Sequence, residues 1–134
     1  MELERFIVPD LYDIGTYSHI VRAGKTLYIA GQVARDLEGR TVGVGDAAAQ
    51  VRGAFENLKR CLRSQGADFD RVVKMTLYVV GAENVAAVRN VYPSYFRADC
   101  KPVSTLLVVA GLSRPDMLFE VDVIAVLGDS PAAP

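Results

Sequence analysis

The sequence predicts an α+β domain in which two helices cover one face of a mixed β-sheet. Two long stretches, residues 46–66 and 84–96, place apolar residues at helical spacing. The rest of the chain holds apolar runs of strand length, separated by residues that favour turns. The predicted order is therefore ββαβαββ. Because 134 residues suffice for one core but not for two, we expect a single domain over 1–134.

The first two strands are expected in SHIVRAGKTLYIAGQ, residues 18–32, with a tight turn at Ala23-Gly24-Lys25. An additional strand around Arg5–Val8 would precede them. The segment LEGRTVGVGD that follows is rich in glycine and predicts a loop. This loop leads into the first helix.

The first helix is predicted to begin after Asp46, whose side chain suits an N-cap, and to end at Gly66. Its apolar side includes Cys61, which there acts as a small hydrophobic residue. The other side carries Arg52, Glu56, Lys59, Arg60 and Arg63. Such a mixture of charges is typical of a solvated helix face rather than of an RNA-binding surface.

The remaining elements are a strand over 71–80, a helix over 84–96 that contains a proline, and strands over 103–109 and 117–126. A sheet covered on one side only should alternate between apolar and polar residues. Strand 71–80 is instead apolar at odd and even positions: Val73, Met75, Leu77 and Val79, and also Val72, Tyr78 and Val80. No further helix remains to cover the second face. We therefore expect another copy of the chain to cover it, which predicts a homo-oligomer.

Composition and charge narrow the functional classes. The formal net charge of −1 offers no basic surface for a phosphate backbone, so a nucleic-acid partner is not expected. The N-terminus MELERFIVPD has acidic residues where a signal peptide would carry basic ones, and no apolar stretch is long enough for a membrane span. We therefore expect a cytoplasmic protein without a membrane partner. The end GDSPAAP, about 128–134, predicts a flexible tail.

Motifs for metals and cofactors are missing from the sequence. Cys61 and Cys100 are the only cysteines, and no cluster of His or Cys stands near them, so no disulfide framework and no metal site are predicted. There is no phosphate-binding loop, dinucleotide fingerprint or nucleophile elbow, so no cofactor is expected. His19 follows Tyr17 by two residues and could share its face of a strand, although a lone histidine is more often structural.

Two carboxylates interrupt the apolar strand MLFEVDVIAV. Glu120 and Asp122 are predicted to lie on the same side of it. Burying a carboxylate is costly unless it is paired or serves a site. One hypothesis is that these residues meet a Lys or Arg at a subunit rim. The other is that one of them activates water as a general base.

The order of elements, together with IAGQ, ENLKRCLRSQGADFDRVVKMTLYV, VYPSYF, KPVSTLLVV and FEVDVIAV, resembles the Rid family, also called YjgF or L-PSP proteins. The resemblance runs from about Tyr12 to Leu127. It implies a chorismate-mutase-like fold, a homotrimer and ligand clefts at the subunit interfaces. It also implies hydrolysis of small imines and enamines to 2-keto acids and ammonia without a cofactor.

The resemblance implies site residues one by one. Tyr17 in IGTY matches the family tyrosine, and Glu120 in FEVD matches the glutamate that helps to activate water. These two are the expected catalytic residues. Gly31 and Gln32 match the backbone element of the family's SGQ, in which Ala30 replaces the serine. These three are expected to line the binding site.

Ser104 stands where the family has an arginine that binds the substrate carboxylate, because PARS aligns with Pro102-Val103-Ser104-Thr105. An arginine makes two charge-assisted bonds to a carboxylate, whereas a hydroxyl makes one neutral bond. The replacement should cost about 2–3 kcal/mol, or roughly 30- to 150-fold in affinity. Good activity on the usual imino acids is therefore not expected. Arg89, which aligns with a family asparagine near the cleft, is a candidate substitute.

Three functional hypotheses remain from the sequence. The first is a divergent Rid-type hydrolase that acts on a small imine, enamine or amide-like metabolite, with Glu120 as the base. The second is a non-catalytic protein that senses a small metabolite in the same cleft. The third, suggested by the endoribonuclease label of some relatives, is RNA cleavage, which the charge balance disfavours.

Overall fold

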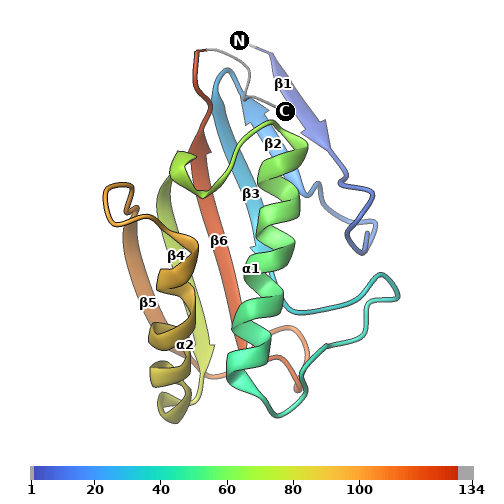
Figure 1. The fold of residues 1–134 in the computed structure, drawn as a ribbon. Coiled ribbons are helices and arrows are strands. Elements are labelled where there is room, and N and C mark those ends of the chain that lie inside the picture. Colours follow the sequence, from blue (N-terminus) through green and yellow to red (C-terminus); the bar gives the residue numbers. More distant parts are fainter. Residues whose placement is uncertain (1, 130–134) are drawn as a thin grey trace.

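The computed structural model describes residues 2–129. A six-stranded sheet has the strand order β1-β2-β3-β6-β4-β5 (Figure 1). All neighbouring strands are antiparallel except β4 and β5, so the predicted mixed sheet is confirmed. The strands are β1 Leu3–Phe6, β2 Ile20–Ala23, β3 Thr26–Gln32, β4 Val72–Val80, β5 Val103–Val109 and β6 Phe119–Val126. The helices are α1 Ala47–Ser64 and α2 Val85–Val91, with short 3-10 turns η1 Phe69–Arg71, η2 Ala82–Asn84 and η3 Tyr92–Tyr95.

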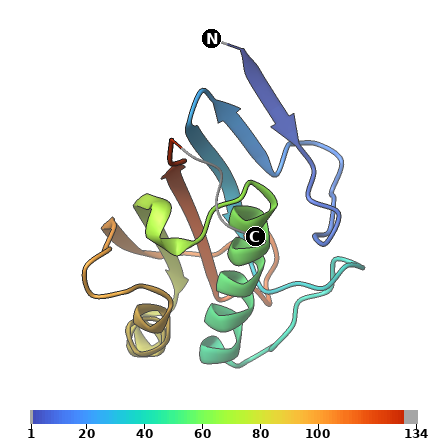
Figure 2. The ribbon, with the colours of Figure 1, turned by 45° about the horizontal axis from the view of Figure 1, so that its top comes forward.

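Helices α1 and α2 lie on the same side of the sheet (Figures 1 and 2). Helix α1 begins at the predicted cap, since the Asp46 carboxylate accepts a hydrogen bond of 3.0 Å from the backbone N–H of Ala49. Its apolar stripe is buried against the sheet and includes Cys61. Phe55 in this stripe stacks on Tyr95 with ring centroids 5.0 Å apart, which joins α1 to η3. The core therefore lies between the two helices and one face of the sheet.

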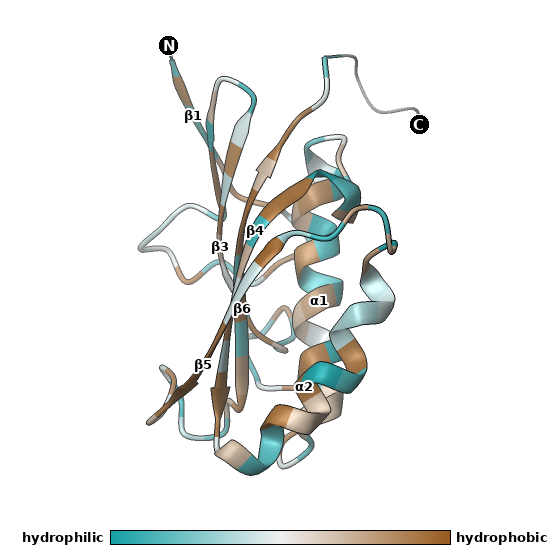
Figure 3. Ribbon diagram, turned by 90° about the vertical axis from the view of Figure 1, so that its left-hand side faces the viewer, coloured by the Kyte–Doolittle hydropathy of each residue, from teal (hydrophilic) through white to brown (hydrophobic). Residues whose placement is uncertain are grey.

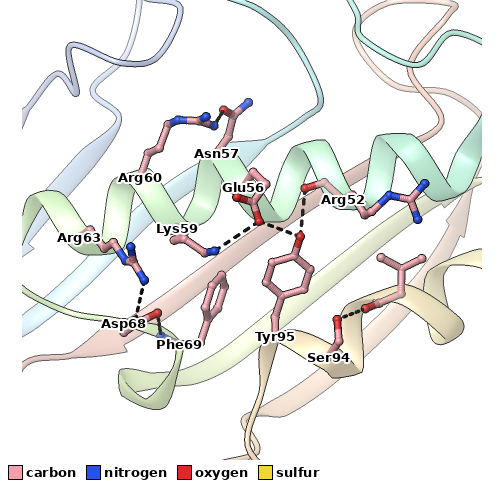
Figure 4. A network of polar contacts seen from close by, with 11 residues as sticks. Arg52, Glu56, Asn57, Lys59, Arg60, Arg63, Asp68, Phe69, Ser94 and Tyr95 are labelled. Carbon is pink, nitrogen blue, oxygen red and sulfur yellow. Dashed lines mark hydrogen bonds and ion pairs between the residues drawn. The ribbon is translucent and has the colours of Figure 1, made fainter.

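The charged face of α1 is connected to neighbouring segments by polar contacts (Figure 4). Tyr95 Oη donates to Glu56 Oε2 at 2.9 Å, and Lys59 Nζ lies 3.5 Å from the same oxygen. Burial, together with the neighbouring Glu56, raises the pKa of Tyr95 to about 12. Further along the helix, Arg63 reaches Asp68. These contacts join α1 to η3 and to the segment before η1.

The first strand and the second helix differ most from their predicted bounds. Strand β1 is Leu3–Phe6 rather than the predicted Arg5–Val8, because Val8 is buried and gives its backbone N–H to the His19 side chain instead of to a strand. The predicted helix over 84–96 divides into α2 and η3. Pro93 lies in the first turn of η3, where a proline has no N–H to continue an α-helical ladder.

The alternation of side chains along strand 71–80 is interrupted at its start. Val72 is buried, whereas Val73 is 45% exposed. The register between β4 and β6 shifts between Val72 and Lys74, which is a β-bulge. An inserted residue reverses the faces of the side chains that precede it, so the simple period of two fails there. Beyond the bulge, Met75, Leu77 and Val79 face the helices.

The sheet face turned away from α1 and α2, called the open face below, carries no helix among the described residues (Figure 3). Along β6, Phe119, Val121 and Val123 are buried under the helices, so Glu120 and Asp122 point to the open face. Large apolar side chains are exposed on this face, including Tyr28 at 50% and Leu107 at 45%. Helices cover the other face only.

Candidate functional site

Glu120 lies directly over the backbone of Gly31. Strands β3 and β6 pair regularly up to Ile29, and the register then shifts before Gln32, so Ala30 and Gly31 form a bulge beside Glu120. A Cβ atom on Gly31 would overlap the Glu120 carboxylate, with the Cδ atom only 2.8 Å away. Real Cβ atoms do not approach neighbouring atoms so closely. Glycine at position 31 thus makes room for the Glu120 side chain.

Electrostatics around Glu120 favour its protonated form. Partial burial raises the pKa of the Glu120 carboxyl, and the negative charge of Asp122 raises it further, while Arg35 opposes this effect. Asp122 itself accepts a hydrogen bond of 2.8 Å from Tyr78 Oη. A carboxyl group whose pKa is raised toward neutrality is suited to take a proton from water and return it.

Tyr17 meets a residue that the sequence interpretation missed. Arg35 Nη2 donates a hydrogen bond of 2.9 Å to Tyr17 Oη. The Arg35 guanidinium also lies over the ring of Tyr12, 5.2 Å from its centroid. Since the Arg35 charge acts on the Glu120 carboxyl, we treat Tyr17, Gly31, Arg35 and Glu120 as one set, the Glu120 group. The only sequence signal for Arg35 is a cation shortly after AGQ.

His19 is not in the Glu120 group, although alternation with Tyr17 suggested a shared face. It is only 2% exposed. Its Nδ1 accepts from the backbone N–H of Val8 at 2.9 Å, and its Nε2 donates to the carbonyl oxygen of Tyr12 at 3.0 Å. These bonds select the Nε2–H tautomer. His19 therefore holds the loop before β2 in place and has no ring nitrogen free for chemistry.

The predicted binding residues in AGQ contribute in different ways. Ala30 is half-buried, and its backbone N–H donates to the carbonyl oxygen of His19 at 2.9 Å. The side chain of Gln32 is buried and donates to the carbonyl oxygen of Ala30 at 3.0 Å. Gln32 thus stabilises the bulge that presents Gly31 to Glu120.

Ser104 lies in a separate cavity of about 290 Å³ between β5 and η3, the Ser104 cavity. It pairs with Met75, which faces the helices, so Ser104 also points to the helix side. The cavity is mainly apolar, and Lys101 contributes a cation. Its lining residues are Met75, Tyr92, Pro93, Phe96, Lys101, Pro102 and Ser104.

A single chain does not bring Glu120 and Ser104 together. Glu120 pairs with Tyr78 on β4, whereas Ser104 pairs with Met75, and the two side chains point to opposite faces of the sheet. Their Cα atoms are separated by two strand spacings across the sheet and by three residues along the strands. The resulting distance is roughly 14 Å.

The other predicted binding residues are dispersed in the same way. Val103 and Thr105 are exposed on the open face of the edge strand β5. Arg89 is exposed in the last turn of α2. Of the predicted site residues, Gly31 and Glu120 lie directly against each other within one chain, and Tyr17 is joined to Arg35.

Comparisons with known proteins agree with this architecture. Residues 9–127 match the family model described as Endoribonuclease L-PSP. A RutC family protein of Pyrococcus horikoshii is 35% identical over 112 residues, which are 84% of this chain and 87% of that protein. The mouse protein named 2-iminobutanoate/2-iminopropanoate deaminase is 33% identical over 115 residues, 86% of this chain and 84% of that protein.

Solved structures show the same fold. The structure of YyfA, a Rid family protein of Yersinia pestis, matches with a TM-score of 0.87 and 26% sequence identity. The alignment covers 94% of this chain and 100% of the YyfA chain. A Thermotoga maritima structure has a TM-score of 0.84 and 32% identity, and covers 93% of this chain and 98% of that chain. The fold and the sequence together define a small α+β protein of the YjgF type. The chain belongs to the Rid family, also called L-PSP.

Two further observations concern the described residues only. No helix in residues 2–129 combines the length and the apolar character needed to cross a membrane. The same residues contain no group of three or more His, Cys, Asp or Glu side chains that could hold a metal ion.

Proposed function

We propose that this chain is a Rid-type hydrolase that acts on a small imine, enamine or amide-like metabolite in the cytoplasm, with Glu120 as the base. The observation that carries the proposal is the position of Glu120, held over the Gly31 backbone with a raised carboxyl pKa that the charge of Arg35 partly opposes. The mouse relative named 2-iminobutanoate/2-iminopropanoate deaminase adds support from outside the structure.

The proposed chemistry needs no cofactor. Glu120 takes one proton from water while the water oxygen forms a bond to the imine carbon. The protonated Glu120 gives that proton to the nitrogen, which completes a carbinolamine. Glu120 then takes the proton of the carbinolamine hydroxyl and delivers it to the nitrogen, the carbon–oxygen double bond forms, and the carbon–nitrogen bond breaks. Imine and water thus become a ketone and ammonia. We assign the role of orienting the substrate to Tyr17, whose hydroxyl accepts a hydrogen bond from Arg35.

We further propose that the chain assembles as a homotrimer whose neighbouring subunits complete each cleft. One subunit supplies the Glu120 group and the AGQ backbone. The neighbour supplies the edge of β5 with Val103, Ser104 and Thr105, and the α2 residue Arg89. This arrangement is supported by the uncovered apolar side chains of the open face and by the distance between Glu120 and Ser104 within one chain.

The test is an assay in which 2-iminobutanoate is generated in solution by a threonine dehydratase and its decay is followed with and without the purified protein. We expect measurable but slow acceleration, because the Ser104 hydroxyl cannot supply the positive charge of the family arginine. Ser104→Arg should increase kcat/KM by roughly 30- to 150-fold, the inverse of the estimated loss.

Two results would contradict the proposal. If neither the wild-type protein nor Ser104→Arg accelerates the decay of imines, enamines or small amides, the chain is not a hydrolase of this type. If the protein still binds metabolites in the cleft, the hypothesis of a non-catalytic sensor would replace that of a hydrolase. If the wild-type protein hydrolyses the imine as fast as Ser104→Arg does, the missing charge at position 104 does not limit the reaction, and the expected loss in affinity is wrong.

A further inference from the structure

The backbone of Arg35 is held rigidly after β3. Residue 35 forms an antiparallel bridge with Thr41 across the following loop. From α1, the buried side chain of Asn57 donates to the carbonyl oxygen of Val33 at 2.9 Å and reaches that of Arg35 at 3.4 Å. The backbone at Arg35 is therefore held in place by hydrogen bonds to the following loop and to α1.

The guanidinium of Arg35 rests on neutral groups. Below it lies the ring of Tyr12, which packs so tightly on Gly39 that a Cβ atom there would be 2.8 Å from Tyr12 Cζ. The backbone carbonyl of Tyr12 is in turn held by His19. One Arg35 nitrogen donates to Tyr17 Oη. The side chain is thus oriented by a ring and a hydroxyl, neither of which neutralises its charge.

Arg35 has no acidic partner among the described residues, a property that it shares with several other arginines of the chain. Within residues 2–129, no carboxylate lies within 4.0 Å of its nitrogens, whereas arginines 40, 63, 97 and 114 each meet an aspartate. A guanidinium has five N–H donors, and the bond to Tyr17 uses one of them. The remaining donors can serve a ligand.

We propose that Arg35 is the anion-binding residue of the Glu120 group and holds a small carboxylate together with the Tyr17 hydroxyl. The inference rests on the proposed location of the site and gives the cleft one cation, at a position other than that of Ser104. Because Tyr17 Oη accepts from Arg35, its own O–H is free to donate to the same carboxylate. The planar fork of a guanidinium matches a carboxylate in two parallel hydrogen bonds.

Two other cations compete for this role. Lys101 lines the Ser104 cavity, and Arg89 is exposed on α2. Both belong to the helix side of the sheet, whereas Arg35 lies beside Tyr17 and acts on Glu120. Binding through Arg35 therefore places the carboxylate against the Glu120 half of the cleft rather than against the Ser104 half.

The experiment compares two probes of nearly equal shape, 2-oxobutanoate and its neutral amide, by NMR titration of the full chain. The wild-type protein should prefer the carboxylate. Arg35→Gln should weaken its binding by about tenfold or more while changing amide binding by less than about twofold. Arg35→Lys, which keeps the charge and loses the fork, should fall in between. Arg40→Gln, in the same loop but paired with Asp36, is the matched control and should bind both probes like the wild type.

Each alternative result overturns the inference. It fails if the wild-type protein shows no preference for the carboxylate, or if Arg35→Gln weakens both probes equally, which would indicate a shaping role. It also fails if Lys101→Gln or Arg89→Gln abolishes the preference while Arg35→Gln retains it. Thermal unfolding of every variant identifies loss of fold. If no imine is hydrolysed but carboxylate binding depends on Arg35, the proposed reaction is wrong and this inference stands.

Discussion

The carboxyl group of Glu120 occupies the space that a side chain at Gly31 would need. The bulge between Ile29 and Gln32 creates this relationship, because it brings an unpaired stretch of β3 beside the neighbouring strand. Gly31 has no positive φ that would require glycine, so the requirement is one of space. Position 31 and position 120 should therefore behave as a coupled pair.

Gly31→Ala should displace the Glu120 carboxyl and lower turnover on the order of 100-fold, the effect expected of a misplacement of about 1 Å. It should also reduce stability by about 1–3 kcal/mol through overpacking. Gly111→Ala is the matched control, because a Cβ atom there meets nothing within 4 Å. Combining Gly31→Ala with Glu120→Ala should recover most of the lost stability in urea unfolding. Additive losses in the double variant would show that the two residues are not coupled.

Glu120→Gln keeps the shape of the side chain and removes the base. Turnover of an accepted substrate should fall by about 10²- to 10⁴-fold, while the oligomer stays assembled. In the wild-type protein, activity should be lost on acidification at a higher pH than the usual glutamate pKa of about 4.3, because the Glu120 pKa is raised and only the carboxylate is a base. A variant that retains full activity would exclude Glu120 as the base.

The same raised pKa has a consequence for stability. The folded state holds the Glu120 proton more tightly than the unfolded state does, so the stabilisation that the neutral carboxyl provides is lost as the pH rises through the raised pKa. Glu120→Gln does not ionise. Its thermal midpoint should therefore rise relative to the wild type between about pH 4 and neutral pH. A difference between the two proteins that does not change with pH would contradict the raised pKa.

The open face should be covered by other copies of the chain. Sedimentation equilibrium should give about three times the chain mass of 14.5 kDa. Leu107→Asp, which puts a charge on the exposed apolar part of this face, should shift the protein toward the monomer. Ser64→Asp, at an exposed position of α1 on the opposite side, should leave the mass unchanged. A wild-type monomer at micromolar concentration would refute both the assembly and the shared clefts.

His19 should be a structural residue. His19→Ala leaves the backbone N–H of Val8 and the carbonyl oxygen of Tyr12 without their partners. The cost should be about 1–3 kcal/mol for each group that remains buried, measured by urea unfolding. His19→Gln, which offers both a donor and an acceptor, should restore part of it. If His19→Ala keeps its stability and loses only turnover, His19 takes part in the chemistry after all.

Local patterns in the sequence determined the elements and the family. The apolar positions of α1 repeat at helical spacing, and Asp46 caps that helix as predicted. The regular alternation along β6 placed Glu120 and Asp122 on the face away from the helices. Both depend on neighbouring residues in the chain, so periodicity alone could predict them. The positions of Tyr17, Ser104 and Glu120 in the family pattern could likewise be read without coordinates.

Only the tertiary structure decided what surrounds those residues. A bulge depends on the partner strand, so neither the exposure of Val73 nor the contact of Gly31 with Glu120 could be foreseen from one strand. Arg35 follows a strand in sequence, and it became part of the site because the chain folds Tyr12 and Tyr17 against it. Side-chain periodicity carries no information about such contacts between distant segments. They arise from packing, in which a void or an unpaired polar group is costly.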